Sequence, residues 1–437
     1  MNPVDRFGDR FDSRLSGALE DLASPQFPDY FEDVLAHAVA RGQRPAWTFP
    51  ERWIPMSTIS QSIPASPVPW RTLGIAALLV ALLVATAVIS FGLRPQPVPE
   101  PFGPASNGLV AYVANGDIFT RNLDTGEETP VVTGPELDVY PFFSRDGLSI
   151  GWFRIETYES NEATLMVGAP DGSDARALIG PTEIDWAAWS PSSDAFAVIS
   201  VVDGSRQLSI VPTSADEESR TIDLPVVPRG HVEWRPPDGN ELIFFGIDGG
   251  SYSVYGVRPD GAGFRQVSGD ITGDQAFGPI EITPDGTTAL YTQGGSVTRV
   301  AVLDLETGEA RPFGEALAPP PGYNGSIEHH GSPSLLPDGE RIIFVRYWNH
   351  EDGVQRTQLQ VASLSTDGAD AVAVTPVRDA DAQNNPYWQT VAPDGSQVLI
   401  VENDTQATWL VPSAGGEMES VDLGEVGDPP TWQRLAP

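Results

Sequence analysis

One short motif recurs along most of this chain and limits what it can fold into. A turn written Ser/Thr-Pro-Asp-Gly stands between two apolar runs, as in PIEITPDGTTALYT at residues 279–292. Glycine supplies the positive φ that a tight hairpin turn needs, so each copy predicts a pair of antiparallel strands. The six copies are residues 140–153, 186–200, 232–246, 279–292, 332–345 and 386–401.

A second turn element alternates with the first. It occurs at residues 123–128, 170–174, 259–263, 305–310, 365–370 and 413–418, and residues 214–219 fill one further slot without the glycine. Two hairpins in each unit of about 45 residues give four antiparallel strands. One such sheet cannot bury both of its faces, so the sheets are expected to stack radially around a channel, as the blades of a propeller do.

The two ends of the repeat region predict how the ring closes. The chain ends with PPTWQRLAP, which matches the first strand of a unit, and residues 108–127 match the remainder. We therefore expect a mainly β fold with seven blades, one of them shared between the two ends, so that no edge strand is left open. Six or eight blades are the alternatives.

The repeated element resembles that of TolB-like, WD-repeat-like β-propellers. The resemblance covers about residues 108–437 and rests on Ser/Thr-Pro-Asp-Gly followed by an apolar strand. It implies a propeller fold. It implies a role in binding and assembly rather than one particular reaction, because propellers of this family mostly have such roles.

An uncharged stretch at residues 72–93 lies between Arg71 and Arg94. As a helix with about 1.5 Å rise per residue it crosses a hydrocarbon core of about 30 Å. A cleaved signal peptide is the rival interpretation, but the 70 preceding residues are too long for its charged leader. Arg52 and Arg71 precede the stretch, which favours an N-terminus inside. We expect a single-pass bacterial membrane protein with residues 1–70 in the cytoplasm, a proline-rich tether at 94–107 and an extracytoplasmic propeller.

The N-terminal arm predicts a cytoplasmic partner. Apolar residues recur at helical spacing in residues 5–22 and 28–42, and a Trp- and Pro-containing juxtamembrane segment follows. The layout of helical arm, single span and outer domain resembles that of membrane-bound anti-sigma factors. That resemblance implies a regulator such as a sigma factor as the partner. The chain has no cysteine, so the zinc-binding motif of that family is absent.

The aspartates of the turns could be catalytic, metal-binding or purely structural. Their recurrence favours structure, because the same turn occurs in six copies and one copy loses the glycine. We expect these carboxylates to accept hydrogen bonds from nearby backbone N–H groups. The turn aspartates are Asp146, Asp238, Asp285, Asp338 and Asp394.

The opposite face of the propeller carries the expected ligand-binding residues. Long insertions at residues 155–163, 318–331, 346–356 and 377–386 are predicted to be loops there. The starts of the inner strands form a ring at the channel mouth, and three histidines lie nearby. The candidates are Tyr140, Asp185, His231, Phe277, His329, His330, His350, Asn385 and Asp428. The histidines lack helical metal-ligand spacing, so we expect no metal and no cofactor.

Charge and motifs narrow the function. The chain carries 60 acidic and 25 basic residues, a net charge of −35, which excludes duplex nucleic acid as a partner. No nucleophile elbow is present, so we expect no enzymatic activity. The sequence predicts an anchored propeller that binds or senses a protein, peptide or glycan. The alternatives are an envelope enzyme with its site at the channel mouth and a surface scaffold without signalling.

Overall fold

A computed structural model describes residues 78–79 and 97–437, apart from 272–275, 295–296, 381–386 and 404. The chain divides into two compact units, Met1–Arg94 and Pro95–Pro437. The expected arm, and most of the expected span, lie outside the described residues. Leu78 and Leu79, which fall within that span, are helical. No helix in the described part of the chain is long and apolar enough to cross a membrane.

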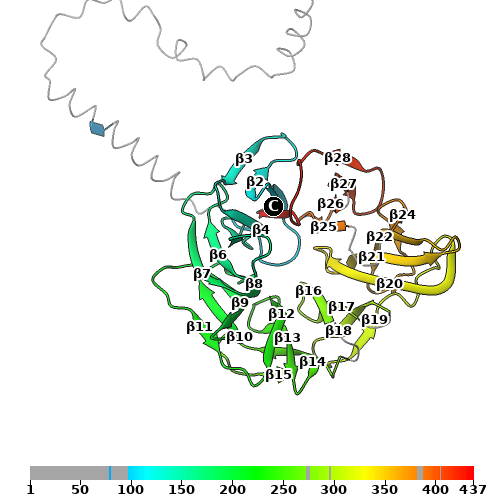
Figure 1. Cartoon of the computed structure of the whole chain (residues 1–437), viewed down its shortest axis with the longest axis horizontal. Helices are drawn as coiled ribbons and strands as arrows, with labels where there is room; N and C mark the ends of the chain where they lie inside the picture. The colour runs from blue at the N-terminus through cyan, green and yellow to red at the C-terminus, as the bar shows by residue number, and fades with distance from the viewer. Residues whose placement is uncertain (1–77, 80–96, 272–275, 295–296, 381–386, 404) are drawn as a thin grey trace, which may run out of the picture. The chain divides into compact units, whose positions relative to one another are not determined.

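The second unit is built from seven antiparallel sheets arranged in a ring (Figure 1). In the first half of the ring the strands are β1 (Ser106–Ala114), β2 (Asp117–Arg121), β3 (Glu128–Val132), β4 (Leu137–Phe143), β5 (Ile150–Ile155), β6 (Ala163–Gly168), β7 (Arg176–Thr182), β8 (Ile184–Trp189), β9 (Ala195–Val202), β10 (Ser205–Pro212), β11 (Arg220–Ile222), β12 (Val227–Trp234), β13 (Leu242–Asp248), β14 (Ser251–Val257) and β15 (Arg265–Gln266).

The second half of the ring continues the same pattern. Its strands are β16 (Ala276–Ile282), β17 (Thr288–Gln293), β18 (Arg299–Asp304), β19 (Ala310–Pro312), β20 (Tyr323–Leu335), β21 (Arg341–His350), β22 (Gln355–Ser363), β23 (Val372–Ala373), β24 (Arg378–Asp379), β25 (Tyr387–Val391), β26 (Gln397–Glu402), β27 (Thr408–Pro412), β28 (Glu419–Val421) and β29 (Thr431–Leu435).

The ring closes through a sheet shared by the two ends of the repeat region. Strand β29 pairs antiparallel with β1, with Trp432 opposite Val110, in the sheet order β29-β1-β2-β3. The remaining six sheets each follow the chain outward from one inner strand. The seven-bladed, mainly β fold predicted from the repeats is therefore confirmed.

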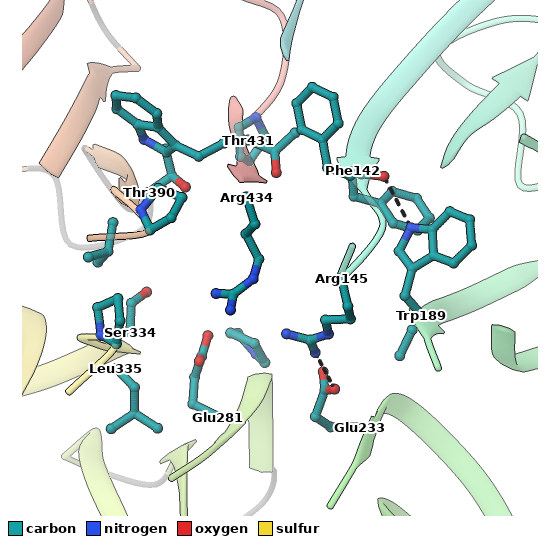
Figure 2. A pocket seen from close by; sticks show the side chains of 18 of the residues that line it. Phe142, Arg145, Trp189, Glu233, Glu281, Ser334, Leu335, Thr390, Thr431 and Arg434 are labelled. Carbon is teal, nitrogen blue, oxygen red and sulfur yellow. Dashed lines mark hydrogen bonds and ion pairs between the residues drawn. The ribbon is translucent and has the colours of Figure 1, made fainter. Parts of the chain in front are cut away.

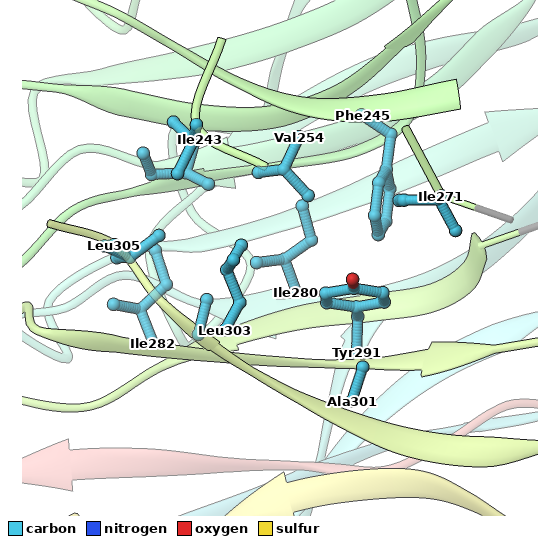
Figure 3. Packing of buried hydrophobic residues seen from close by; sticks show 12 residues of the cluster. Ile243, Phe245, Val254, Ile271, Ile280, Ile282, Tyr291, Ala301, Leu303 and Leu305 are labelled. Atoms are coloured by element: carbon cyan, nitrogen blue, oxygen red, sulfur yellow. The ribbon is translucent and has the colours of Figure 1, made fainter. Parts of the chain in front are cut away.

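Apolar side chains fill the spaces between neighbouring blades. Figure 3 shows Phe245 and Val254 of one blade packed against Ile280 and Tyr291 of the next. Middle strands face a neighbour on both sides, so they are apolar throughout, as in Leu242–Phe245, which is buried. This packing between sheets explains why the repeats carry continuous apolar runs.

Two stretches predicted to be loops are strands. Most of residues 318–331 belongs to β20, and much of 346–356 belongs to the ends of β21 and β22. The pairing continues to Tyr323 opposite His350 and Asn349 opposite Gln355. Pairing satisfies the backbone groups, and the fully buried Trp348 donates a hydrogen bond to the Pro321 carbonyl at 3.1 Å. Of the other two insertions, 155–163 connects β5 to β6, and 377–386 contains β24 before the part that lies outside the described residues.

The inner strands share an irregularity near the channel. The pairing register shifts at Tyr140 in β4, at Asp185 in β8, and at Gly230 and His231 in β12. Tyr140 has a φ of 50°, in the left-handed region. Bulges of this kind change the direction in which side chains point. They place the side chains that form the candidate site.

Candidate functional site

The central channel encloses a cavity of about 680 Å³. Each blade contributes one residue at the same repeat position, the second residue before the turn motif. These residues are Phe142, Ala188, Glu233, Glu281, Ser334, Thr390 and Thr431. The cavity is thus lined by one unlike side chain from each blade, which is how a symmetric fold acquires a chemically asymmetric site.

Four charged side chains gather at one end of this cavity, as Figure 2 shows for Arg145, Glu233, Glu281 and Arg434. An Arg145 guanidinium nitrogen lies 2.7 Å from Glu233 Oε1. Both side chains are more than two-thirds buried. Two cations and two acids inside an apolar fold can hold a ligand with groups of both signs, or one with many hydroxyls.

Burial shifts the ionisation of these groups. Burial raises the pKa of Glu233, although Arg145 opposes the shift. Burial, with the charge of Glu233, raises the pKa of Glu281 to about 7. Burial, with the charge of Arg145, lowers the pKa of Arg434 to about 10. Arg434 Nε is buried without a hydrogen-bond partner among the described residues. The cavity therefore holds polar groups that a ligand could satisfy.

Aromatic side chains line another part of the cavity, among them Tyr140, Phe142, Phe153, Trp186 and His231. The rings of Trp186 and His231 have centroids 3.9 Å apart. Burial lowers the pKa of His231 to about 4, so the imidazole is neutral at pH 7. Its Nδ1 is buried and has no hydrogen-bond partner in the described part of the chain. Flat rings beside carboxylates and hydroxyls suit the alternating apolar and polar faces of sugars and peptides.

Comparisons with solved structures agree with this architecture. The second unit is a seven-bladed β-propeller. An oligogalacturonate lyase from Vibrio parahaemolyticus is 13% identical, with 73% of this chain and 86% of that chain covered and a TM-score of 0.50. TolB from Acinetobacter baumannii is 15% identical, with 74% and 81% covered and a TM-score of 0.44. A TolB-type structure from Agrobacterium tumefaciens is 18% identical, with 66% and 96% covered and a TM-score of 0.43.

These likenesses concern the fold. No family model matches the chain, and no curated protein matches it either. The site must therefore be interpreted from its own residues.

Two of the predicted site residues, Tyr140 and His231, line the channel of the propeller. Asp428 lies beside Tyr140, whose backbone N–H donates to Asp428 Oδ2 at 3.4 Å. Burial raises the pKa of Asp428 to about 6, although hydrogen bonds from Tyr140 oppose the shift. The structure therefore brings Tyr140 and Asp428 together at the channel.

Asp185 does not line the channel. Its Oδ2 lies 2.9 Å from Arg206 Nε and accepts a hydrogen bond from the Gly230 N–H at 3.1 Å. Asp185 thus holds the bulge that precedes His231. It positions a channel residue rather than contacting a channel ligand.

His330 occupies a different part of the propeller. Its Nε2 lies 2.7 Å from Glu328 Oε1, which also accepts from Arg346 Nε at 2.5 Å. Burial opposes ionisation of Glu328, but the hydrogen bonds from His330 and Arg346 lower its pKa to about 2. His330 and Glu328 border a separate cavity of about 220 Å³, together with Arg299 and Phe313.

The other two histidines make local contacts. His329 Nδ1 accepts a hydrogen bond from the Thr298 N–H at 3.0 Å. His350 Nδ1 lies 2.9 Å from Asp352 Oδ1 at the end of β21. No group of three His, Asp or Glu side chains in the described part of the chain is placed to hold a metal. Phe277 lies in β16, but its side chain, like all of Asn385, is outside the described residues.

The turn aspartates contact the backbone of their own turns. Asp285 Oδ1 accepts hydrogen bonds from the Thr283 hydroxyl at 2.6 Å and from the Thr287 N–H at 3.1 Å. Asp338 and Asp394 accept comparable backbone N–H bonds, and Asp146 accepts one from Leu148. The Asp238 carboxylate receives the Asn240 amide at 3.5 Å instead.

Sequence reasoning missed the charged end of the channel, although the repeats contain a signal for it. Five blades have proline three residues after the residue that lines the cavity: Pro191, Pro236, Pro284, Pro337 and Pro393. The other two have Arg145 and Arg434 at that position. Glu233 and Glu281 stand where other repeats have small or apolar residues. Departures from the repeat identify the site, whereas the repeated residues build the fold.

Proposed function

We propose that this protein is a membrane-anchored, extracytoplasmic propeller that binds its ligand in the central channel. The observation that carries the proposal is the cluster of Arg145, Glu233, Glu281 and Arg434 inside the cavity of about 680 Å³. Buried charges are costly to a fold unless they are paired or used. Three of these four groups have shifted pKa values, which is typical of binding and catalytic sites.

The proposed ligand is a segment of a peptide or a glycan. The cavity combines aromatic rings with two carboxylates, two guanidinium groups and the hydroxyls of Ser334, Thr390 and Thr431. Such a lining matches a chain that presents flat apolar faces and hydrogen-bonding groups together. A bacterial envelope supplies both kinds of polymer.

The anchoring and coupling parts of the proposal rest on sequence. The uncharged stretch at 72–93 supports a single span with the propeller outside. The helical pattern of residues 1–70 supports a cytoplasmic arm that contacts a regulator such as a sigma factor. A pull-down with residues 1–70, repeated with the full chain in detergent, tests this part. Recovery of no specific regulator in either format contradicts it.

A retention assay tests the channel site. Full-length protein in nanodiscs is immobilised and exposed to peptide and envelope-glycan fragments, and retained fragments are identified by mass spectrometry. We expect retention by the wild type and loss in the double variant E281Q/R434Q. The variant E306Q, an acid-to-amide change at a carboxylate 71% exposed, should retain the same fragments as the wild type. Retention that E281Q/R434Q does not alter contradicts a channel site, as does an empty result.

A second candidate is an envelope enzyme that acts in the same channel. Glu281 favours it, because a carboxyl whose pKa lies at about 7 can donate or accept a proton near neutral pH. Chemical change of a retained fragment during incubation, abolished by E281Q, would support this candidate. Fragments released unchanged support binding alone.

A further inference from the structure

The residues just before β1 lie against the turn end of the channel. Arg434 Nη2 donates hydrogen bonds to the carbonyl of Glu100 at 2.8 Å and to that of Gly103 at 2.9 Å. The Ala105 N–H donates to the Pro393 carbonyl at 2.9 Å. These bonds tie the tether to two different blades, those of β29 and β25.

Phe102 brings the tether into the cavity itself. Its ring lies below the Arg145 guanidinium, with the Arg145 Cζ 5.1 Å from the ring centroid. The ring also packs against the cluster that contains Ala188 and Trp234. Phe102 and Gly103 both line the channel cavity. The tether therefore supplies part of the cavity wall.

A continuous set of contacts links the channel charges to the tether. Glu233 pairs with Arg145 inside the cavity, and Arg145 stacks on Phe102. A ligand that competes for Glu233 or Arg145 must disturb the contact between the Arg145 guanidinium and the Phe102 ring. Cation–π contacts depend on the cation staying over the ring, so displacement of Arg145 weakens the docking of the tether.

We propose that tether residues 100–103 form the floor of the channel site, that Phe102 contacts the ligand, and that occupancy is coupled to tether docking. This inference rests on the proposed function of the channel. Coupling of two equilibria is reciprocal. The factor by which bound ligand changes the equilibrium for tether docking is also the factor by which tether docking changes the affinity for the ligand. The ligand must enter from the end away from the tether. The coupling also gives an outer domain a physical connection to the segment that precedes it.

The hydrogen-exchange rate of the Ala105 amide measures how firmly the tether is docked, and no ligand is needed for this measurement. Ala105 is 5% exposed, and its N–H is bonded to another blade, so slow exchange is expected in the full-length wild type. E233Q removes the partner of Arg145 from inside the channel and should speed exchange at Ala105 by about tenfold. E306Q, a matched acid-to-amide change, should exchange like the wild type.

Two further variants separate docking from global stability. F102A should speed Ala105 exchange, whereas V98A, at a tether side chain 52% exposed, should not. In F102A and V98A the amide of Phe244, a fully buried residue of β13, should exchange at the wild-type rate; in E233Q it should speed only by the factor set by the loss of unfolding free energy. Fast exchange at Ala105 in the wild type overturns the inference, and so does an E233Q rate equal to that of E306Q. Acceleration at Phe244 in F102A to the same extent as at Ala105 overturns it as well.

The retention assay then decides whether Phe102 contacts the ligand. F102A should weaken retention by about tenfold while V98A leaves it unchanged. Wild-type retention by F102A overturns the role of Phe102 in binding. That failure is distinct from failure of the channel site, because E281Q/R434Q would still abolish retention.

Discussion

Arg145 and Glu233 form an ion pair with an N–O distance of 2.7 Å, although 88 residues separate them in the chain. Arg145 follows β4 and Glu233 lies in β12, so the pair joins two blades that are not neighbours. A bond across the ring holds the channel at one width. It also leaves its two charged groups facing the cavity.

Breaking this pair should destabilise the propeller. E233Q leaves Arg145 mostly buried without its carboxylate, which should cost about 1–2 kcal/mol of unfolding free energy, since the pair retains some solvent contact. Denaturant titration followed by tryptophan fluorescence measures the change. E306Q should have almost no effect, and equal midpoints for E233Q and E306Q would contradict the prediction.

Stability should depend on pH through Glu281. Its folded pKa of about 7 exceeds the ordinary value of 4.5, so the folded state binds more protons between these values. Stability from this group is therefore complete below pH 4.5 and is lost as the pH rises to about 7, by about 1–3 kcal/mol. Thermal midpoints across pH 4–8 should show a smaller decline in E281Q than in the wild type. An identical decline in both would show that Glu281 does not hold its proton.

Glu328 should affect folding stability with the opposite pH dependence, and its substitution should cost more unfolding free energy. Its pKa of about 2 lies below the ordinary 4.5, so the stability it provides is present above pH 4.5 and lost as the pH falls toward 2. At pH 7, E328Q leaves Arg346, 3% exposed, without a carboxylate, and should cost about 2–4 kcal/mol. Chemical denaturation measures this cost. D260N, at the exposed pair with Arg258, should be indistinguishable from the wild type.

The turn glycines should differ in their tolerance of alanine. At Gly286, φ is +71° and a Cβ would lie 2.0 Å from the Pro236 carbonyl oxygen of the preceding blade. At Gly353, φ is +83°, but no atom lies within 4 Å of that Cβ. We expect G286A to cost about 3 kcal/mol and G353A about 1 kcal/mol. Similar thermal midpoints for the two variants would show that the close approach at Gly286 relaxes.

The fold could be predicted from the sequence because the same hairpin turn, with an apolar strand on each side, recurs along the chain. Five of the six turn copies carry glycine where the sixth has Ser193, which also has a positive φ, and the split repeat at the two ends predicts that β29 joins β1. The close contact of Gly286 with the preceding blade could not be predicted, since the repeat shows a conformational need but not a neighbour.

The candidate site was only partly predictable, for a related physical reason. The repeats predict Tyr140 and His231 near the starts of inner strands; both lie at the bulges within β4 and β12, and both line the channel. His330 is predicted at a strand start too, but it lies inside β20, whose extended pairing with β21 places it at another cavity. Arg145 and Arg434 act at positions where the repeat has proline. Their meeting depends on side-chain direction inside the ring, which strand spacing does not specify.

The most direct measurement of the central claim is a hydrogen-exchange footprint of a retained fragment on the full-length protein. Binding in the channel predicts protection in the inner strands β12 and β16, at residues 227–234 and 276–282, together with a change at Ala105. Protection confined to the peripheral segments 155–163 and 346–356, with the inner strands unchanged, would contradict the channel site and place binding on the outer surface of the propeller.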